Sequence, residues 1–225
     1  MTIDLHVLRV FVGADGNHGN PLGVFLDGLR IHLRDRQQVA KLLNFSETVF
    51  VDDVADGAAR IQIYTPGAQL GFAGHPTVGT SWLLRHVGTS VERLDVPAGE
   101  VDVWQDGELA WIRARAAWVH AITIHTCADA AEVEALDGPP AGETSFYAWA
   151  WIDEANGVLR SRYFAGGLGI AEDEATGAAA VVMGDRLGRP LLIRQGRGSE
   201  LHVRPGPDGT VEVGGRVVLE GVQPI

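Results

Sequence analysis

Short runs in which apolar and polar residues alternate fill most of the chain, and such alternation is typical of half-buried β-strands. The expected strands are 5–11, 22–26, 47–54, 59–65, 91–96, 101–104, 109–113, 119–125, 146–152, 158–164, 191–194, 200–204, 210–213 and 217–219. Helical spacing of apolar residues is confined to 33–43, 77–86, 128–136 and an Ala- and Val-rich run that ends at Gly188. Short strands interleaved with a few helices predict an α+β protein.

Two stretches join a strand through a glycine-containing loop to a helix, one in each half of the chain. In 71–79, Gly74 and His75 should lie at a helix N-terminus, because Pro76 suits the first helical turn. The stretch 164–180 has the same order of strand, loop and helix. Backbone N–H groups at a helix N-terminus favour an anion. This weak repeat signal predicts a duplicated chain in which two helix N-termini face one cleft.

A duplicated chain of 225 residues fits two small domains. No Pro-, Gly- or Ser-rich linker separates the halves, so they should pack tightly. We therefore expect an N-terminal domain over 1–114 and a C-terminal domain over 115–225, with the last strand able to return to the first domain.

The formal net charge of −11 argues against nucleic acid and anionic membranes as partners. It leaves an anionic small molecule open as substrate, because local helix dipoles act at short range. The single cysteine, Cys127, rules out an internal disulfide and a two-cysteine metal site, and suits a reducing cytoplasm. We expect no signal peptide and no membrane span, since neither pattern occurs.

Glu47 is the first candidate for chemistry. It begins a hydrophobic strand and is flanked by Phe45, Val49 and Phe50. Partial desolvation would raise the pKa of its carboxyl toward the working pH, as general acid–base catalysis requires. The alternative is a solvated residue at a strand end, and the spacing alone favours that alternative.

His75 and Asp173 are the other candidates. His75 can shuttle a proton or orient a substrate carboxylate, or it can simply cap its helix. Asp173 can hold a substrate group or bind His75, or it can offset the dipole of the second helix. A functional role for either residue depends on whether the two loops meet.

The chain lacks the sequence patterns that are typical of several other kinds of functional site. The eight histidines show no pairing typical of a metal site, and Gly166–Gly169 does not match a dinucleotide fingerprint. Neither Ser46 nor Ser81 lies in a nucleophile elbow. We therefore predict no metal and no cofactor.

Five blocks of sequence, in order, resemble the PhzF family of phenazine-biosynthesis-like proteins. They are Gly19–Val24, Asn44–Val51, Tyr64–Pro66, Gly71–Gly79 and Glu172–Ala179, with a weaker match around Gln195 and at 213–218. The resemblance covers nearly the whole chain. It implies the diaminopimelate-epimerase-like fold, in which two similar domains each wrap a curved sheet or barrel around a central helix.

The resemblance also implies an activity and a site. PhzF isomerises trans-2,3-dihydro-3-hydroxyanthranilate without a cofactor, and the glutamate that moves its proton matches Glu47. By the same matching, His75 and Asp173 act with Glu47. The residues matching a substrate-binding role are Asn20, Gly74, Thr176, Gly177, Ala178 and Gln195. Related epimerases use two cysteines at the helix N-termini, and this chain has none there, which disfavours two-base cysteine racemisation.

Some positions depart from the family pattern. Arg9 and Gln69 stand where acids are usual, Glu174 stands where Pro is usual, and Ala178 stands where Ser is usual. The second half is also shortened. These departures leave Glu47 in place and leave the substrate open.

The sequence therefore favours a cofactor-independent isomerase of a small carboxylate in an interdomain cleft. A lyase or C–C hydrolase on the same scaffold, or a non-catalytic binding protein that keeps the cleft, are the alternatives. The resemblance further implies a homodimer, for which the tryptophan-rich strands offer apolar surface.

Overall fold

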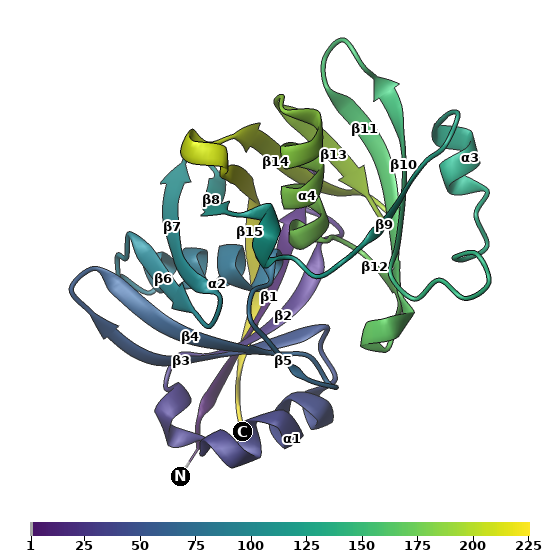
Figure 1. Ribbon diagram of the computed structural model, residues 1–225. Coiled ribbons are helices and arrows are strands. Elements are labelled where there is room, and N and C mark those ends of the chain that lie inside the picture. The colour runs from purple at the N-terminus through teal and green to yellow at the C-terminus, as the bar shows by residue number, and fades with distance from the viewer. Residues whose placement is uncertain (1) are drawn as a thin grey trace.

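The computed structural model describes residues 2–225, and within that range fifteen strands join into one strongly curved sheet (Figure 1). The elements of the first half are β1 (Asp4–Val12), β2 (Asn20–Phe25), η1 (Gly28–Arg30), α1 (Leu33–Leu43), β3 (Glu47–Ala55), β4 (Ala58–Tyr64), β5 (Gln69–Leu70), α2 (Gly74–His86), β6 (Arg93–Val96), β7 (Gly99–Asp106) and β8 (Leu109–Ala114).

The second half follows after a short 3-10 turn, η2 (Ala116–Trp118). Its elements are β9 (Thr123–Thr126), α3 (Ala130–Glu134), β10 (Phe146–Asp153), β11 (Val158–Ala165), η3 (Gly166–Leu168), β12 (Ile170–Asp173), α4 (Gly177–Leu187), β13 (Leu191–Gln195), β14 (Ser199–Pro205), η4 (Pro207–Gly209) and β15 (Val211–Pro224). Runs of strands, most of them paired antiparallel, are separated by a few helices in both halves, which confirms the predicted α+β class.

The two halves repeat one pattern of strand pairing. In the first half β2 pairs with β3 in parallel, β3 with β4 antiparallel, β4 with β6 in parallel, and β6, β7 and β8 follow as a meander. The second half has the same sequence of directions through β9, β10, β11, β13, β14 and β15. α2 and α4 occupy equivalent crossovers in the two patterns. The pairing confirms the duplication that the glycine loops predicted.

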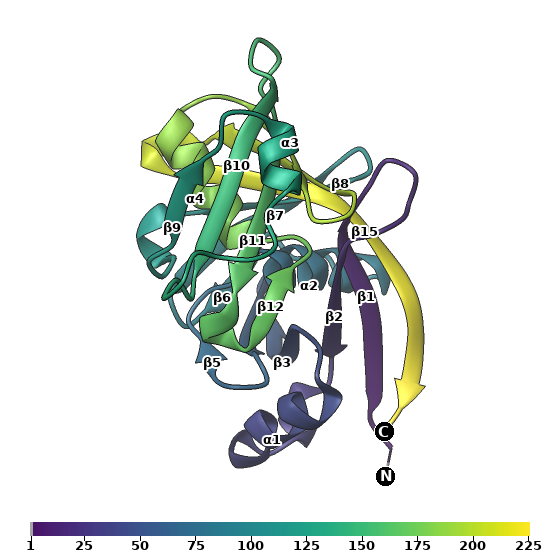
Figure 2. The same cartoon turned by 90° about the vertical axis from the view of Figure 1, so that its right-hand side faces the viewer.

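β15 closes the first half into a barrel. It pairs antiparallel with β8 on one side and with β1 on the other, and it runs past the whole length of β1 (Figure 2). Two short strands were predicted here, and that prediction is wrong. Gly214 and Gly215 resemble a turn in the sequence, but they lie within β15, where a Cβ would collide with the rings of Trp111 and Phe11.

α2 lies inside the barrel. It contacts β1, β2, β3, β7, β8 and β15, and its residues from Gly74 to Ser81 are all buried. A helix that is enclosed in this way needs small and apolar residues on every face. α2 begins at Gly74 rather than at the predicted Thr77, so Gly74 and His75 form its first turn.

α1 covers the outside of the barrel, with the predicted bounds of 33–43. Its Arg36 is buried and pairs with Asp52 of β3 at 2.5 Å. The same guanidinium donates to the carbonyl of Gly28 at 2.8 Å. A buried charge of this kind needs its partner, so Arg36 fixes α1 and the preceding turn against β3.

The segment between the halves differs from prediction. Residues 119–122 have no regular structure and only Thr123–Thr126 forms a strand, so the predicted strand over 119–125 is too long. This segment leads from β8 of the barrel to β9, at the far end of the strand order. Within residues 2–225, no helix is both long and apolar enough to span a membrane.

Candidate active site

The first turns of α2 and α4 meet between the two halves. A Cβ on Gly74 would stand 2.6 Å from the Cα of Gly177, and a Cβ on Gly177 would stand 2.8 Å from the Cα of Gly74. Any side chain at either position would therefore push the helices apart. The two glycines therefore allow the two helix backbones to approach each other closely.

Glu47 and His75 form a buried pair beside this junction. Oε2 of Glu47 lies 3.1 Å from Nε2 of His75, and both side chains are almost fully enclosed. Glu47 reaches this place because β3 starts alongside β2, where Leu22 is its partner in the parallel ladder. The expectation of a solvated strand-end carboxylate does not hold.

Burial changes the protonation of both groups. It raises the pKa of Glu47 to about 8, with a smaller contribution from the negative charge of Asp173. It lowers the pKa of His75 to about 3. At neutral pH the pair is therefore mostly an uncharged carboxylic acid beside an uncharged imidazole, and both remain able to exchange a proton.

Asp173 ends β12 and is held by three neighbours. Its carboxylate accepts hydrogen bonds from the amide of Asn20 at 2.6 Å and from the hydroxyl of Thr176 at 2.5 Å. Gln195 donates to the hydroxyl of Thr176 at 2.8 Å and to the backbone carbonyl of Asp173 at 2.9 Å. Burial raises the pKa of Asp173 to about 6, although the bonds from Thr176 and Asn20 act in the opposite direction. Asp173 is thus mostly ionised at neutral pH, unlike Glu47.

Asn20 connects the two carboxyl groups. Its amide nitrogen lies 3.3 Å from Nδ1 of His75 while it also donates to Asp173. Glu47, His75, Asn20 and Asp173 therefore form one chain of contacts, although they come from β3, α2, β2 and β12.

A small pocket of about 40 Å³ lies in front of this chain of contacts. Glu47, Gly74, His75, Asp173, Thr176, Gly177 and Ala178 line it. Asn20 and Gln195 do not line the pocket but donate hydrogen bonds to Asp173. The structure thus brings all nine residues singled out from the sequence to one place, and their roles in catalysis and binding remain predictions.

Two further polar residues line the same pocket, and no sequence pattern indicated either of them. Tyr163 lies on β11, where its alternation with neighbours is that of a core residue. His120 lies in the segment that was predicted to be a strand. Apolar side chains complete the walls, among them Leu70, Phe72 and Val119.

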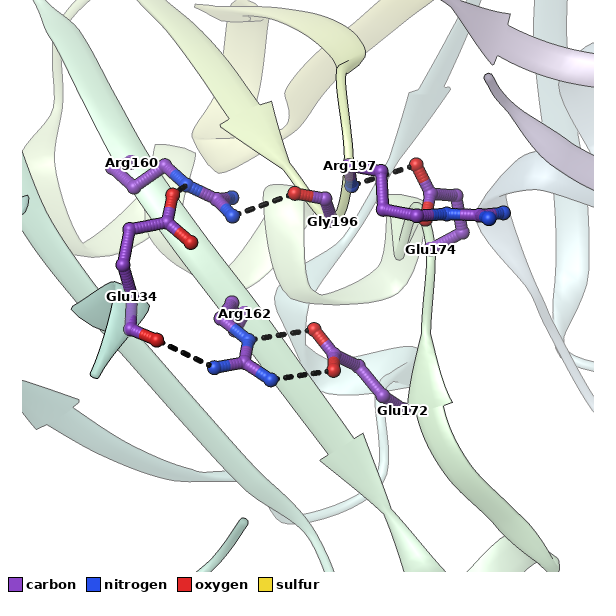
Figure 3. A pocket seen from close by; sticks show the side chains of 7 residues that line it. All are labelled: Glu134, Arg160, Arg162, Glu172, Glu174, Gly196 and Arg197. Carbon is purple, nitrogen blue, oxygen red and sulfur yellow. Dashed lines mark hydrogen bonds and ion pairs between the residues drawn. The ribbon is translucent and has the colours of Figure 1, made fainter. Parts of the chain in front are cut away.

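A larger hollow of about 590 Å³ lies on the second half, outside this pocket (Figure 3). Its arginines are already engaged: Arg160 donates to Glu134 at 2.5 Å, and Arg162 contacts Glu172 through two bonds of 2.7 and 2.8 Å. Arg162 also donates to the carbonyl of Leu136 at 2.6 Å. These bonds tie α3 to β12, next to Asp173, and leave little capacity for a bound anion.

One group of side chains in the described part of the chain has metal-ligating atoms close together. It comprises His125, Cys127 and Glu132, whose ligand atoms lie within 4.8 Å of one another. Cys127 is packed into an apolar cluster with Val133 and Phe146. None of the three ligating residues lines the pocket that contains Glu47.

The chain is similar both to curated proteins and to solved structures. A fission yeast protein named "Antisense-enhancing sequence 1" is 38% identical over 102 residues, which are 41% of this chain and 34% of that protein. The trans-2,3-dihydro-3-hydroxyanthranilate isomerase of Pseudomonas aeruginosa is 45% identical over 64 residues, 28% of this chain and 23% of the enzyme. This chain thus matches only 34% and 23% of the length of these two curated relatives.

Solved structures match the fold over its full length. A PhzF-family protein of Enterococcus faecalis superposes with a TM-score of 0.82 at 19% identity, covering 100% of this chain and 99% of the other. A probable proline racemase of Agrobacterium radiobacter superposes with a TM-score of 0.64 at 14% identity, covering 99% and 92%. These matches confirm the expected epimerase-like fold.

The family assignment comes from a family model, because the curated relatives match too little of the chain and the solved structures share too little sequence identity. The model PhzC-PhzF, described as phenazine biosynthesis-like protein, matches residues 10–137, which is more than half of the chain. That match includes Glu47 and His75 and runs from the end of β1 to just beyond α3. The chain belongs to the PhzC-PhzF family of phenazine biosynthesis-like proteins.

Proposed function

We propose that the protein is a cofactor-independent isomerase in which Glu47 moves a proton between two carbon atoms of a small carboxylate. The observation that carries this proposal is the burial of Glu47 against His75, with a pKa raised to about 8. A general acid–base is most effective when its pKa lies near the working pH. Relatives named as isomerases support the reaction class.

Glu47, His75 and the two helix N-termini each have a place in the proposed step. The ionised fraction of Glu47 takes a proton from a carbon that is acidified by a neighbouring carbonyl or carboxyl group, and the resulting acid returns a proton to another carbon. Nε2 of His75 lies 3.1 Å from Oε2 of Glu47 without a formed hydrogen bond, and a small rotation of either side chain would let the imidazole stabilise the carboxyl group. The first turns of α2 and α4 favour the substrate carboxylate.

Asp173 completes the arrangement. Two carboxyl groups with pKa values of about 8 and about 6 supply an acid and a carboxylate at the same pH. The substrate class is taken from the relative that acts on trans-2,3-dihydro-3-hydroxyanthranilate. The step transfers only protons, so it balances without an oxidant or reductant.

Proton exchange in heavy water tests the proposal. Incubation of the protein with trans-2,3-dihydro-3-hydroxyanthranilate in D₂O should place deuterium at one product carbon, as read by proton NMR and mass spectrometry. Glu47→Gln keeps the shape of the side chain but cannot exchange the proton, and the rate should fall by roughly 10²- to 10⁴-fold. Glu108→Gln, which changes an exposed carboxylate on the barrel surface, is the matched control.

Three results would contradict the proposal. Near-normal turnover by Glu47→Gln would move the acid–base role to another group, with Asp173 next. Products of lower mass than the substrate would indicate a lyase or hydrolase. Binding without any turnover or exchange would indicate a binding protein that keeps the pocket.

A further inference from the structure

Tyr163 adds a polar group to the pocket, apart from the Glu47–His75 pair. Its ring is buried in the sheet, with 1% of the residue exposed. Its hydroxyl lies 2.9 Å from Oγ of Ser145 and 3.2 Å from Nε2 of His120. The phenol is therefore held from two sides and has a fixed direction relative to the pocket that it lines.

The direction of the hydrogen bonds can be followed from Ser145 outward. The hydroxyl of Ser145 can donate to the carbonyl of Ala121 at 3.3 Å, and its oxygen then accepts from Tyr163. When Nε2 of His120 carries the proton, the hydroxyl of Tyr163 donates to Ser145 and accepts from His120; in the other tautomer it donates to His120 and accepts from Ser145, so in both cases its proton and one lone pair are engaged. A phenol oxygen has two lone pairs, so one remains to accept a bond from a ligand.

Both groups are uncharged at neutral pH. Burial, with the charges of Asp173 and Glu47, raises the pKa of Tyr163, while its bond to Ser145 acts in the opposite direction. Burial lowers the pKa of His120. This end of the pocket therefore has no positive charge with which to attract a second carboxylate, and its free lone pair suits a neutral hydrogen-bond donor.

We propose that Tyr163, oriented by Ser145 and His120, binds a hydroxyl or amino group of the substrate and so selects small monocarboxylates that carry such a donor. The proposal rests on the proposed function, which makes this pocket the substrate site. Leu70, Phe72 and Val119 line the pocket beside Tyr163 and suit the carbon skeleton. Tyr163 thereby determines specificity, and Ser145 and His120 are positioning residues.

Ligand binding tests the proposal without requiring turnover. The probes are benzoate and its 2-, 3- and 4-hydroxy isomers, titrated into the wild-type protein by calorimetry. At least one isomer should bind roughly 3- to 10-fold more tightly than benzoate, because one additional neutral hydrogen bond has about that net effect. The corresponding methoxy compound, which cannot donate, should show no such gain.

Tyr163→Phe should abolish the preference for the hydroxyl while leaving the affinity for benzoate unchanged, which shows that the pocket is intact. Tyr147→Phe is the matched control, because Tyr147 faces Tyr163 across β10 and β11, is equally buried, and does not line the pocket. That variant should keep the wild-type preference. Ser145→Ala should reduce the preference, since the phenol loses one of its two fixed partners.

The outcomes separate this proposal from the proposed function. If benzoate binds but no hydroxy isomer binds more tightly, or if Tyr163→Phe keeps the preference, the role of Tyr163 is wrong and the isomerase proposal stands. If wild-type protein binds none of the four probes, the role of Tyr163 and the carboxylate substrate class are both wrong. The deuterium exchange of Glu47 still reports on the proton-transfer step in that case.

Discussion

At the scale of single residues, the site keeps two carboxyl groups and an imidazole in different protonation states. Glu47 and His75 are uncharged over most of the neutral range. Burial disfavours the charged form of each group, so it raises the pKa of Glu47 and lowers the pKa of His75. Asp173 keeps its charge because Asn20 and Thr176 donate to it. Enclosure without full hydrogen bonding is therefore what distinguishes Glu47 from Asp173.

This arrangement predicts a particular pH dependence of stability. The folded pKa of Glu47 is raised to about 8 from 4.5, so its contribution to stability is lost as pH rises from about 4.5 to about 8. His75, with a folded pKa lowered to about 3 from 6.5, acts in the opposite direction, but only below pH 6.5. Between pH 6.5 and 8 the effect of Glu47 should therefore dominate.

Urea unfolding at pH 6.5 and at pH 8.5 measures this effect. The free energy of unfolding of the wild-type protein should fall across that interval, and that of Glu47→Gln should change much less. Glu108→Gln should follow the wild type. An equal slope in wild type and Glu47→Gln would show that the carboxyl group of Glu47 is already ionised at neutral pH in the folded protein.

The sequence could name Glu47, His75 and Asp173 as candidates because each lies in a block with a clear local pattern. It could not show that Glu47 touches His75, since residues 28 positions apart meet only through the β2–β3 ladder and α2. The sequence could not identify Tyr163 as a site residue for a different reason. A tyrosine on an alternating strand is usually a core residue, and only Ser145 and His120 give its hydroxyl a direction.

At the scale of elements, the junction of α2 and α4 is the feature that the site depends on. The helices start against one another, and Gly74 and Gly177 make that approach possible. Both glycine loops were evident in the sequence as helix starts. Their mutual contact was not, because it depends on how the two halves are docked.

Substitution of these glycines should be costly. Gly74→Ala or Gly177→Ala places a methyl group within 3 Å of the opposite helix backbone, and such overpacking typically destabilises a protein by about 1–3 kcal/mol. Gly138→Ala is the control, because nothing lies within 4 Å of its Cβ position and its φ is not positive. Chemical denaturation of the three variants measures the difference. Equal stability of all three would mean that the helices separate without loss.

At the scale of the whole molecule, the pocket is too small for its proposed ligand. About 40 Å³ is far below the roughly 300–1,000 Å³ of typical ligand pockets. A neighbouring cavity of about 490 Å³ shares Asn20 and Asp173 with the site and also contacts Phe45, Pro66 and Ile170 from the two halves. Entry of a substrate therefore requires the walls between these spaces to move.

The assembly of the molecule remains a prediction, as does its place in the cytoplasm. The tryptophan residues that suggested a homodimer interface are buried or half-buried, so they offer less surface than expected. Large exposed apolar side chains lie instead at Leu29, Leu33 and Leu42, in and beside α1. Sedimentation that shows only monomer at high concentration would contradict a homodimer.

The closure of the barrel by β15 gives a prediction about the two halves, whose division at residues 114 and 115 we retain as a proposal. The fragment 1–114 contains α2 and seven of the strands around it, but it lacks β15, the strand that joins β8 to β1. Without β15, two sheet edges and the helix inside are exposed to water.

We therefore expect the fragment 1–114 alone to be insoluble or unfolded by circular dichroism. Co-expressed with the fragment 115–225, it should co-purify and show one cooperative thermal transition, because the second fragment supplies β15 in its native place. The control is the intact chain, with the same purification tag. A soluble 1–114 fragment with its own cooperative transition would show that the barrel folds without β15, and that the two halves are independent units rather than one structure shared through a single strand.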